Sequence, residues 1–291
     1  MYSILKKISL WHYNIGFFDF NKQVLFGKAD IHWMVHPYKD RFFADPFIVD
    51  MTTDVIKVLV EELFYHDGRG RITLLTVDRK TFRLLYRKVL LDLSTHLSFP
   101  FIYRTETEIY VIPENSQSGG LHAYHWDGNA ETLTWISTLV EQPLIDSVIV
   151  RDNNGKYLLF GSLPGKQEHA NLFVWQSGEP LRGYERVSSI PVIDNRPDCA
   201  RRGGGFFTVD GTLYAAVQSC AYSYGEALRI CKVNRLSANY LEEEEVGVLR
   251  PDKRYPSGLH TFNLYKGLCV VDGLTYLFRP DKKMINVLKR F

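Results

Sequence analysis

The sequence predicts an all-β protein, a single five-bladed β-propeller domain that takes up residues 1–291. Short apolar runs rich in Val, Ile, Phe and Tyr alternate with Gly, Asp, Asn and Pro, as strands and turns do. Long amphipathic helical patterns are nearly absent. One hairpin pattern recurs five times along the chain, at a spacing of roughly 50 residues that suits a four-stranded propeller blade.

The repeated hairpin is an apolar strand, a short polar turn and a second apolar strand. The five first strands are expected at residues 45–49, 99–103, 146–150, 204–208 and 260–264. Turn residues support the pairing, since residues 152–155 are Asp-Asn-Asn-Gly and since Asp210 and Gly211 separate two further apolar runs. A β-sandwich is the competing architecture, but it does not explain why a polar residue recurs before the first strands.

The composition is that of a globular protein, with 45% hydrophobic residues and 35 basic side chains against 33 acidic ones. Such a chain buries a full core, which excludes a disordered or collagen-like protein. A formal net charge of +2 gives no reason to expect a nucleic-acid partner. The four cysteines stand far apart and lack zinc-ligand spacing, which indicates reduced thiols in a cytoplasmic protein.

The amino-terminal segment, residues 1–18, carries Lys6 and Lys7 but has no continuous apolar stretch and no small-residue cleavage site. We therefore do not expect a cleaved secretion signal. No part of the chain reaches the run of roughly 20 apolar residues that crosses a bilayer, so we predict no stable membrane insertion. Residues 1–18 could still make peripheral contact with a membrane as a weak amphipathic element.

The residues just before the first strands of a propeller converge on one end of its central channel. These positions predict a site, and they are Asp45, Ser98, Asp146, the pair Arg201 and Arg202, and His260. Carboxylates, guanidinium groups and an imidazole are costly to gather in one cavity, which favours a functional reason for them. A structural alternative remains open for each position. Asp45 could open a turn and Asp146 could cap a strand. Arg201 and Arg202 could be surface charge beside a Gly-rich bulge, and His260 could be a core histidine.

Three segments resemble the five-bladed propellers of the arabinanase, β-xylosidase and furanosidase superfamily: residues 43–48, residues 145–158 and residues 258–260. In that superfamily, the Asp of an Ala-Asp-Pro type motif is the general base. A second Asp orients the substrate and tunes the acid, and a His from the last blade lines the channel floor. The resemblance assigns these roles to Asp45, Asp146 and His260.

A closer resemblance, to the amino-terminal propeller domain of plant glucosamine inositolphosphorylceramide transferases, covers nearly the whole chain. It rests on residues 11–16, 43–48, 61–62, 68–72, 97–101, 112–114, 218 and 224–225. The resemblance implies substrate contacts from Glu62, Glu114, Gln218 and Tyr224. Similar stand-alone proteins are associated with bacterial surface-polysaccharide synthesis, so it also implies a role in making a polysaccharide or glycolipid.

The chain departs from the hydrolases at the start of the fourth blade, where residues 199–205 hold two arginines and no general-acid Glu. The leaving group of an ordinary glycoside needs that acid, because its oxygen must be protonated as the bond breaks. A nucleotide-diphosphate leaving group instead needs positive charge next to its phosphates. We therefore predict a carbohydrate-active glycosyltransferase with a nucleotide-sugar donor. Asp45 would be its base, and Arg201, Arg202 and His260 would bind the donor phosphates.

Two other functions remain open. Glu61, Glu62 or Glu114, at the ends of second strands, could supply the missing acid and make the protein a glycoside hydrolase or phosphorylase. A sugar-binding scaffold without catalysis is the other alternative. The sequence predicts no cofactor and no metal ligands, and it leaves a divalent metal open.

Overall fold

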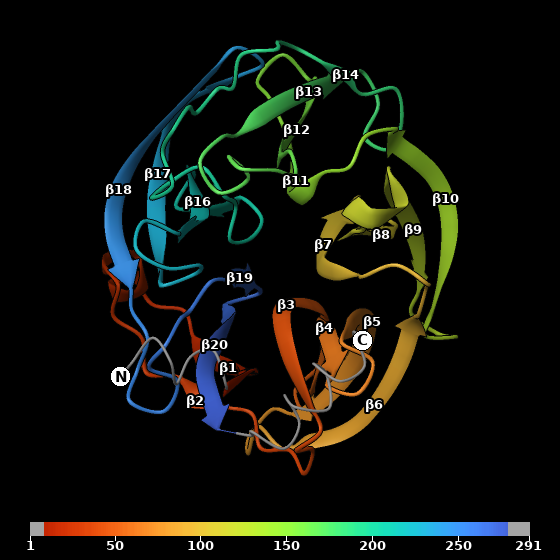
Figure 1. The fold of residues 1–291 in the computed structure, drawn as a ribbon, viewed down its shortest axis with the longest axis vertical. Helices are drawn as coiled ribbons and strands as arrows, with labels where there is room; N and C mark the ends of the chain where they lie inside the picture. Colours follow the sequence, from red (N-terminus) through yellow and green to blue (C-terminus); the bar gives the residue numbers. More distant parts are fainter. Residues whose placement is uncertain (1–8, 279–291) are drawn as a thin grey trace, which may run out of the picture.

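A computed structural model describes residues 9–278 as five four-stranded sheets arranged in a ring around a central axis (Figure 1). Every strand pairing in these sheets is antiparallel. The predicted all-β, five-bladed propeller is therefore confirmed. Lys6 and Lys7, which belong to the segment considered for membrane contact, lie outside the described residues.

Four blades each consist of four consecutive strands, with the first strand innermost. Blade I contains β3 (Arg41–Met51), β4 (Val55–Phe64), β5 (Arg69–Asp78) and β6 (Leu84–Leu91). Blade II contains β7 (Ser98–Arg104), β8 (Ile109–Glu114), β9 (Leu121–Asp127) and β10 (Thr132–Val140). Blade III contains β11 (Ile145–Arg151), β12 (Tyr157–Ser162), β13 (Phe173–Ser177) and β14 (Glu185–Arg186). Blade IV contains β15 (Phe207–Val209), β16 (Thr212–Ser219), β17 (Ala227–Ser237) and β18 (Tyr240–Leu249).

Blade V is shared between the two ends of the described chain. Its strands, from the axis outward, are β19 (Phe262–Tyr265), β20 (Leu268–Phe278), β1 (Ser9–Asp19) and β2 (His32–Trp33). Pairing of β1 with β20 runs from Ser9 opposite Phe278 to Asp19 opposite Leu268 and closes the ring. Residues 9–18 are thus part of a sheet, with Ile15 and Phe17 fully buried, and not an amphipathic surface element.

Helical structure in the described part is limited to two short 3₁₀ helices, η1 (Lys22–Phe26) and η2 (Ser116–Ser118). No helix within residues 9–278 is long and apolar enough to cross a membrane. All four cysteines are free thiols, and two of them, Cys231 and Cys269, are buried in the core.

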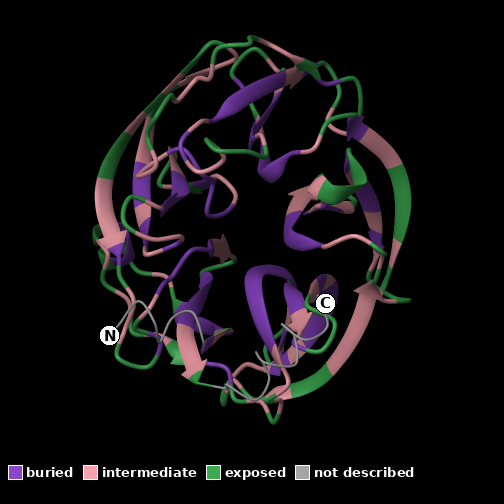
Figure 2. Ribbon diagram, in the orientation of Figure 1, coloured by how far each residue is buried: buried purple, intermediate pink, exposed green. Residues whose placement is uncertain are grey.

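Packing between blades holds the inner strands in place, and Figure 2 shows buried residues concentrated on those strands. Phe47 of β3 packs edge-on against Phe99 and Phe101 of β7, with ring centroids 5.1 and 6.1 Å apart. The outer strands β6 and β10 are mostly half-buried or exposed. Because a close-packed interior allows little displacement, the residues at the axial ends of the inner strands are fixed in position.

Three inner strands share an unusual backbone near their start. Asp45, Phe99 and Asp146 have positive φ values of 50°, 40° and 45°. At each of them the pairing register shifts, as it does at a β-bulge. Non-glycine residues rarely adopt this conformation, which costs energy and is often found at functional sites. In blades I and III the bulge residue is an aspartate whose side chain lines the cavity on the axis.

Candidate functional site

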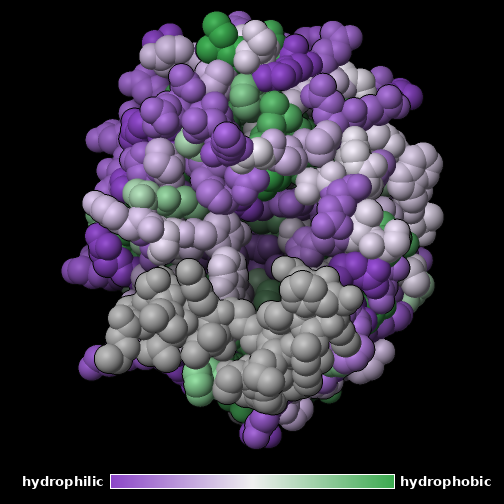
Figure 3. All heavy atoms as spheres, in the orientation of Figure 1, coloured by the Kyte–Doolittle hydropathy of each residue, from purple (hydrophilic) through white to green (hydrophobic). Residues whose placement is uncertain are grey.

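A cavity of about 400 Å³ opens at one end of the propeller axis. Each blade contributes at least one charged or polar side chain to it: Asp45, Glu114, Asp146, Arg201 and His260 come from blades I to V in turn. On the face shown in Figure 3, the ring has a central hollow bordered mainly by hydrophilic residues. The five-blade convergence that the sequence predicted is therefore present, with Arg202 as the exception described below.

Asp45 is held within β3 by groups from blades II and V. Its Oδ1 accepts a hydrogen bond from Thr261 Oγ1 (2.7 Å), and its Oδ2 accepts one from the backbone N–H of Phe99 (3.2 Å). Its own backbone N–H donates to Oδ2 of Asp272 (3.0 Å). Burial raises the pKa of Asp45 to about 6, and the positive charge of His260 limits the rise. Asp45 is therefore mostly ionised at neutral pH.

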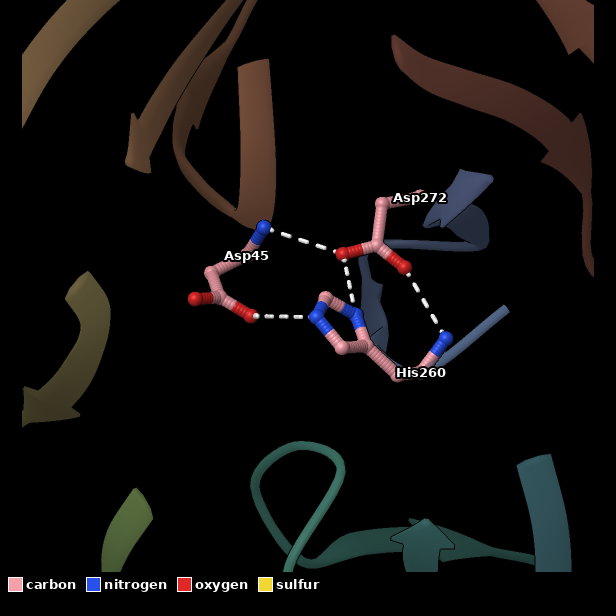
Figure 4. Close-up of side chains that lie close together, drawn as sticks. All are labelled: Asp45, His260 and Asp272. Carbon is pink, nitrogen blue, oxygen red and sulfur yellow. Dashed lines mark hydrogen bonds and ion pairs between the residues drawn. The ribbon is translucent and has the colours of Figure 1, made fainter. Parts of the chain in front are cut away.

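His260 lies between two carboxylates (Figure 4). Its Nδ1 is 2.6 Å from Oδ2 of Asp272, and its Nε2 is 3.9 Å from Oδ1 of Asp45. Burial alone would lower the pKa of His260, but Asp272, followed by Asp45, outweighs it and raises the pKa to about 9. The same contacts lower the pKa of Asp272 against its burial. At neutral pH, His260 is therefore an imidazolium cation between two carboxylates.

Two aromatic rings enclose this cation. Tyr13 of β1 stacks on His260 with a centroid distance of 4.7 Å and an interplanar angle of 14°. Tyr224 meets the imidazole edge-on at 5.4 Å. Both rings also line the cavity. They shield the ion pair from water, which strengthens the interaction between the charges.

Ligand atoms of Asp45, His260 and Asp272 lie within 4.8 Å of one another, so the cluster has the residue types of a metal site. A metal ion would have to displace the imidazole proton that the two carboxylates stabilise. Hard cations such as Ca²⁺ also prefer about six to eight oxygen ligands. The cluster therefore fits a protonated histidine better than a divalent ion.

Asp146 and Arg201 form a buried ion pair on the opposite side of the site. Oδ2 of Asp146 accepts hydrogen bonds from Arg201 Nε (2.5 Å) and from Gln218 Nε2 (2.7 Å). The guanidinium also contacts Nδ1 of His169 at 2.9 Å and lies over the Tyr224 ring, 5.0 Å from its centroid. Asp146 therefore neutralises the one arginine that faces the cavity among the described residues.

Two further carboxyl groups face the cavity from the ends of second strands. Burial, with the charge of Asp146, raises the pKa of Glu114 to about 8. Burial, with the charge of Asp45, raises the pKa of Glu61 well above its usual value. Glu114 is therefore mostly protonated at neutral pH while Asp45 is mostly ionised. Carboxyl groups whose pKa values are pushed apart in this way can act as acid and base.

The structure places three predicted site residues outside the cavity lining. Arg202 is fully buried and pairs with both oxygens of Glu243 on β18, at 2.6 and 3.1 Å. The expectation that it meets Asp45 and His260 at the channel is wrong, because successive residues of an extended chain point in opposite directions and Arg201 takes the inward position.

Glu62 is turned away for the same reason. Its carboxylate pairs with Arg41 (2.5 Å) and Arg87 (2.8 Å), while the preceding residue, Glu61, faces the cavity. Gln218 is buried behind the lining, where it donates to Asp146 and to the backbone carbonyl of Arg202. It can position Asp146 but does not itself line the cavity. The other predicted residues, Asp45, Asp146, Arg201, His260, Glu114 and Tyr224, all line it.

Sequence reasoning missed several residues, above all Asp272. The backbone of Asp272 pairs with Thr261, just before β19. In the same way, Glu61 lies opposite Ala44 of β3, and Glu114 lies opposite Ser98 of β7. The three acidic residues therefore occupy equivalent places in the repeat. Aligning the second strands as well as the first would have found it. Trp11, Tyr13, His96 and His169 also line the cavity, and only Trp11 and Tyr13 lay in a segment that the family resemblance had marked.

The fold and the polar axial cavity define a five-bladed propeller of the kind found in glycoside hydrolases. A family 43 β-xylosidase/α-arabinofuranosidase from a compost microbial metagenome aligns with a TM-score of 0.55 and 12% identity, covering 82% of this chain and 92% of that one. A family 117 glycoside hydrolase from Zobellia galactanivorans aligns with a TM-score of 0.53 and 10% identity, covering 94% and 92%. Such low identities show a shared fold only.

The chain belongs to the family described as glucosamine inositolphosphorylceramide transferase 1, N-terminal, whose family model matches residues 29–258. The Arabidopsis thaliana transferase of that name is 33% identical over 162 residues, covering 54% of this chain and 21% of the plant protein. The counterpart from Oryza sativa subsp. japonica is 28% identical over 215 residues, covering 72% and 29%. The family resemblance is confirmed, and the chain spans less than a third of the length of these relatives.

Proposed function

We propose that this propeller is a carbohydrate-active protein that binds a sugar in its axial cavity and carries out acid–base chemistry at a glycosidic carbon. The observation that carries the proposal is the charge pattern of the cavity. Asp45 is ionised at neutral pH, while Glu114 keeps its proton because its pKa is raised to about 8. One cavity therefore offers both a base and an acid.

In the proposed reaction, Asp45 takes the proton from the hydroxyl group of an acceptor, whose oxygen forms a bond to the anomeric carbon. The bond from that carbon to the leaving oxygen breaks, and Glu114 gives its proton to the leaving oxygen. Asp146, held by Arg201 and Gln218, orients the sugar. The imidazolium of His260 keeps Asp45 ionised by opposing the effect of burial.

Transfer to a sugar or lipid hydroxyl is the leading form of this reaction, because the plant relatives are named as transferases. Synthesis of a surface polysaccharide or glycolipid in the cytoplasm is the setting we propose. Hydrolysis, with water as the acceptor, is the second candidate. It is favoured by Glu114, which keeps its proton at neutral pH, and by Glu61, whose pKa is raised by burial; either carboxyl group can replace the acid absent at the start of blade IV.

A nucleotide-sugar donor has weaker support than the sequence suggested. Arg202 is committed to Glu243, and Arg201 is already neutralised by Asp146. Diphosphate recognition relies on an excess of positive charge and free guanidinium donors. The geometry therefore favours a donor whose leaving oxygen needs a proton, although Arg201 and His260 could still contact a phosphate.

The test is to incubate the purified protein with separate panels of nucleotide sugars and of glycosides, each with and without acceptor alcohols. Glycosylated acceptor supports transfer, and free sugar released from a glycoside supports hydrolysis. Release of a nucleotide identifies a nucleotide-sugar donor. Binding without turnover would make the protein a sugar-binding scaffold, and no binding of any saccharide would overturn the proposal.

A further inference from the structure

Trp11 is a large aromatic side chain that remains open to solvent in the wall of the cavity. It lies near the start of β1, lines the cavity and keeps 45% of its surface exposed. The other tryptophan in the described part of blade V, Trp33, is buried at 6% exposure. An exposed aromatic surface inside a cavity marks a place where a ligand can cover it.

The indole is held in a fixed orientation before any ligand arrives. It stacks on Tyr224 with a centroid distance of 5.8 Å and an interplanar angle of 17°. It also meets Tyr13 edge-on at 6.4 Å. Tyr13 and Tyr224 both pack on His260, so Trp11 is joined through them to the residues around Asp45. A rigid aromatic surface loses little entropy on binding.

Polar groups that can bind hydroxyls lie next to this aromatic surface. His169 is 5.5 Å from the Tyr224 ring, and its Nδ1 accepts from Arg201, which leaves the proton on Nε2. That Nε2 is 3.5 Å from Glu168 Oε1, and both side chains line the cavity. An aromatic face flanked by hydrogen-bonding side chains suits a sugar ring, which has an apolar face of C–H groups and a polar rim of hydroxyls.

We propose that Trp11 forms a second sugar subsite at the mouth of the cavity, where its indole stacks on the ring adjacent to the sugar bound at Asp45. This inference rests on the proposed function and deepens it. The substrate is then an oligosaccharide or a glycoconjugate with at least two sugar units. His169 and Glu168 bind hydroxyls of that second sugar, while a lone monosaccharide occupies only the inner part of the site.

The experiment compares the affinity of a monosaccharide with that of its trisaccharide by titration calorimetry. The probes are xylose with xylotriose, galactose with β-1,3-galactotriose, and N-acetylglucosamine with its β-1,4-linked trimer. For at least one pair, we expect the wild-type protein to bind the trisaccharide about tenfold more tightly or better, as aromatic stacking predicts.

The variants are Trp11→Ala, Trp11→Phe and the control Trp135→Ala, which removes an exposed indole on β10 (58% exposed) that does not line the cavity. Trp11→Ala should abolish the trisaccharide advantage, so that the two sugars of a pair bind equally, with Trp11→Phe intermediate and Trp135→Ala like wild type. Thermal unfolding of each variant confirms that it is folded.

Three results would overturn the inference. If the trisaccharide advantage survives in Trp11→Ala, or if wild type binds both sugars of every pair equally, the second subsite is wrong while sugar binding at Asp45 stands. If wild type binds no saccharide at all, the proposed function fails, and the subsite fails with it.

Discussion

Nδ1 of His260 donates a hydrogen bond to Oδ2 of Asp272 over 2.6 Å, and the same oxygen accepts the backbone N–H of Asp45. The other oxygen of Asp272 accepts the backbone N–H groups of His260 and Thr261, each at 3.0 Å. One buried carboxylate thus connects the closing blade to blade I. It fixes the charge of the imidazole that faces Asp45, so it positions the proposed base without contacting substrate.

Replacing Asp272 by Asn should lower the pKa of His260. The amide carries no charge, and Asp272 is the strongest influence that raises this pKa to about 9. An imidazole titration by NMR measures the shift, with Asp19→Asn, at the far end of β1, as the control. An unmoved imidazole pKa would contradict the role of Asp272.

The ion pair between His260 and Asp272 makes the free energy of unfolding depend on pH. Because the pKa of His260 is raised in the folded state from 6.5 to about 9, its contribution to stability is complete below pH 6.5. That contribution is lost as the pH rises through about 9. Urea unfolding at several pH values should therefore show a slope in this window that is smaller in Asp272→Asn, where only more distant carboxylates still raise this pKa. An equal slope in both proteins would contradict the ion pair.

The rate profile of the wild-type protein should be bell-shaped. The value of kcat/KM should rise as Asp45 loses its proton at about pH 6 and fall as Glu114 loses its proton at about pH 8. Steady-state kinetics with the substrate identified from the panels measure both limbs. A profile that stays flat from pH 5 to 9 would show that neither carboxyl group controls the reaction.

Replacing Glu114 by Gln should impair only reactions that need a proton donor. For an alkyl glycoside we expect kcat/KM to fall by about 10²–10⁴-fold, the usual contribution of a general acid. The leaving group of a nitrophenyl glycoside or a glycosyl fluoride departs without protonation. With these substrates, kcat/KM of the variant should stay close to that of wild type. Comparing the two substrate classes with one variant is the measurement. Equal losses for both classes would exclude Glu114 as the acid.

Arg201 and Arg202 should respond differently to substitution by Met. Arg202→Met leaves Glu243 buried without its partner, which should lower the free energy of unfolding by about 3–5 kcal/mol without changing sugar affinity. Arg201→Met should weaken sugar binding, because it frees Asp146 and removes a cation from the cavity. Urea unfolding and calorimetric titration of both variants separate the effects. A loss of affinity in Arg202→Met would contradict the placement of its side chain.

The repeat made much of the fold and site predictable. Asp45, Asp146 and His260 occupy corresponding places in the repeated hairpins, and a recurring pattern of that kind needs no knowledge of long-range contacts. The closing of blade V was not predictable in the same way, because the pairing of Ser9 with Phe278 joins opposite ends of the described chain and leaves no local signal.

The sequence also could not predict which of two neighbouring side chains points toward the axis. The choice between Arg201 and Arg202, or between Glu61 and Glu62, depends on which of two consecutive residues faces the axis. A bulge or a one-residue shift in register reverses that choice. Glycines around residue 203 gave no alternating pattern that could fix the register there. Charge state was likewise unpredictable, because burial and neighbouring charges set the pKa of Glu114.

The most direct test of the account is the value of kcat/KM for Asp45→Asn, measured beside the control Asp50→Asn, which changes an exposed aspartate on the same strand. We expect Asp45→Asn to lose about 10²–10⁴-fold in kcat/KM while it still folds and binds sugar, as removal of a general base predicts. Asp50→Asn should match wild type. An unchanged rate in Asp45→Asn would contradict the assignment of Asp45 as the base of the cavity.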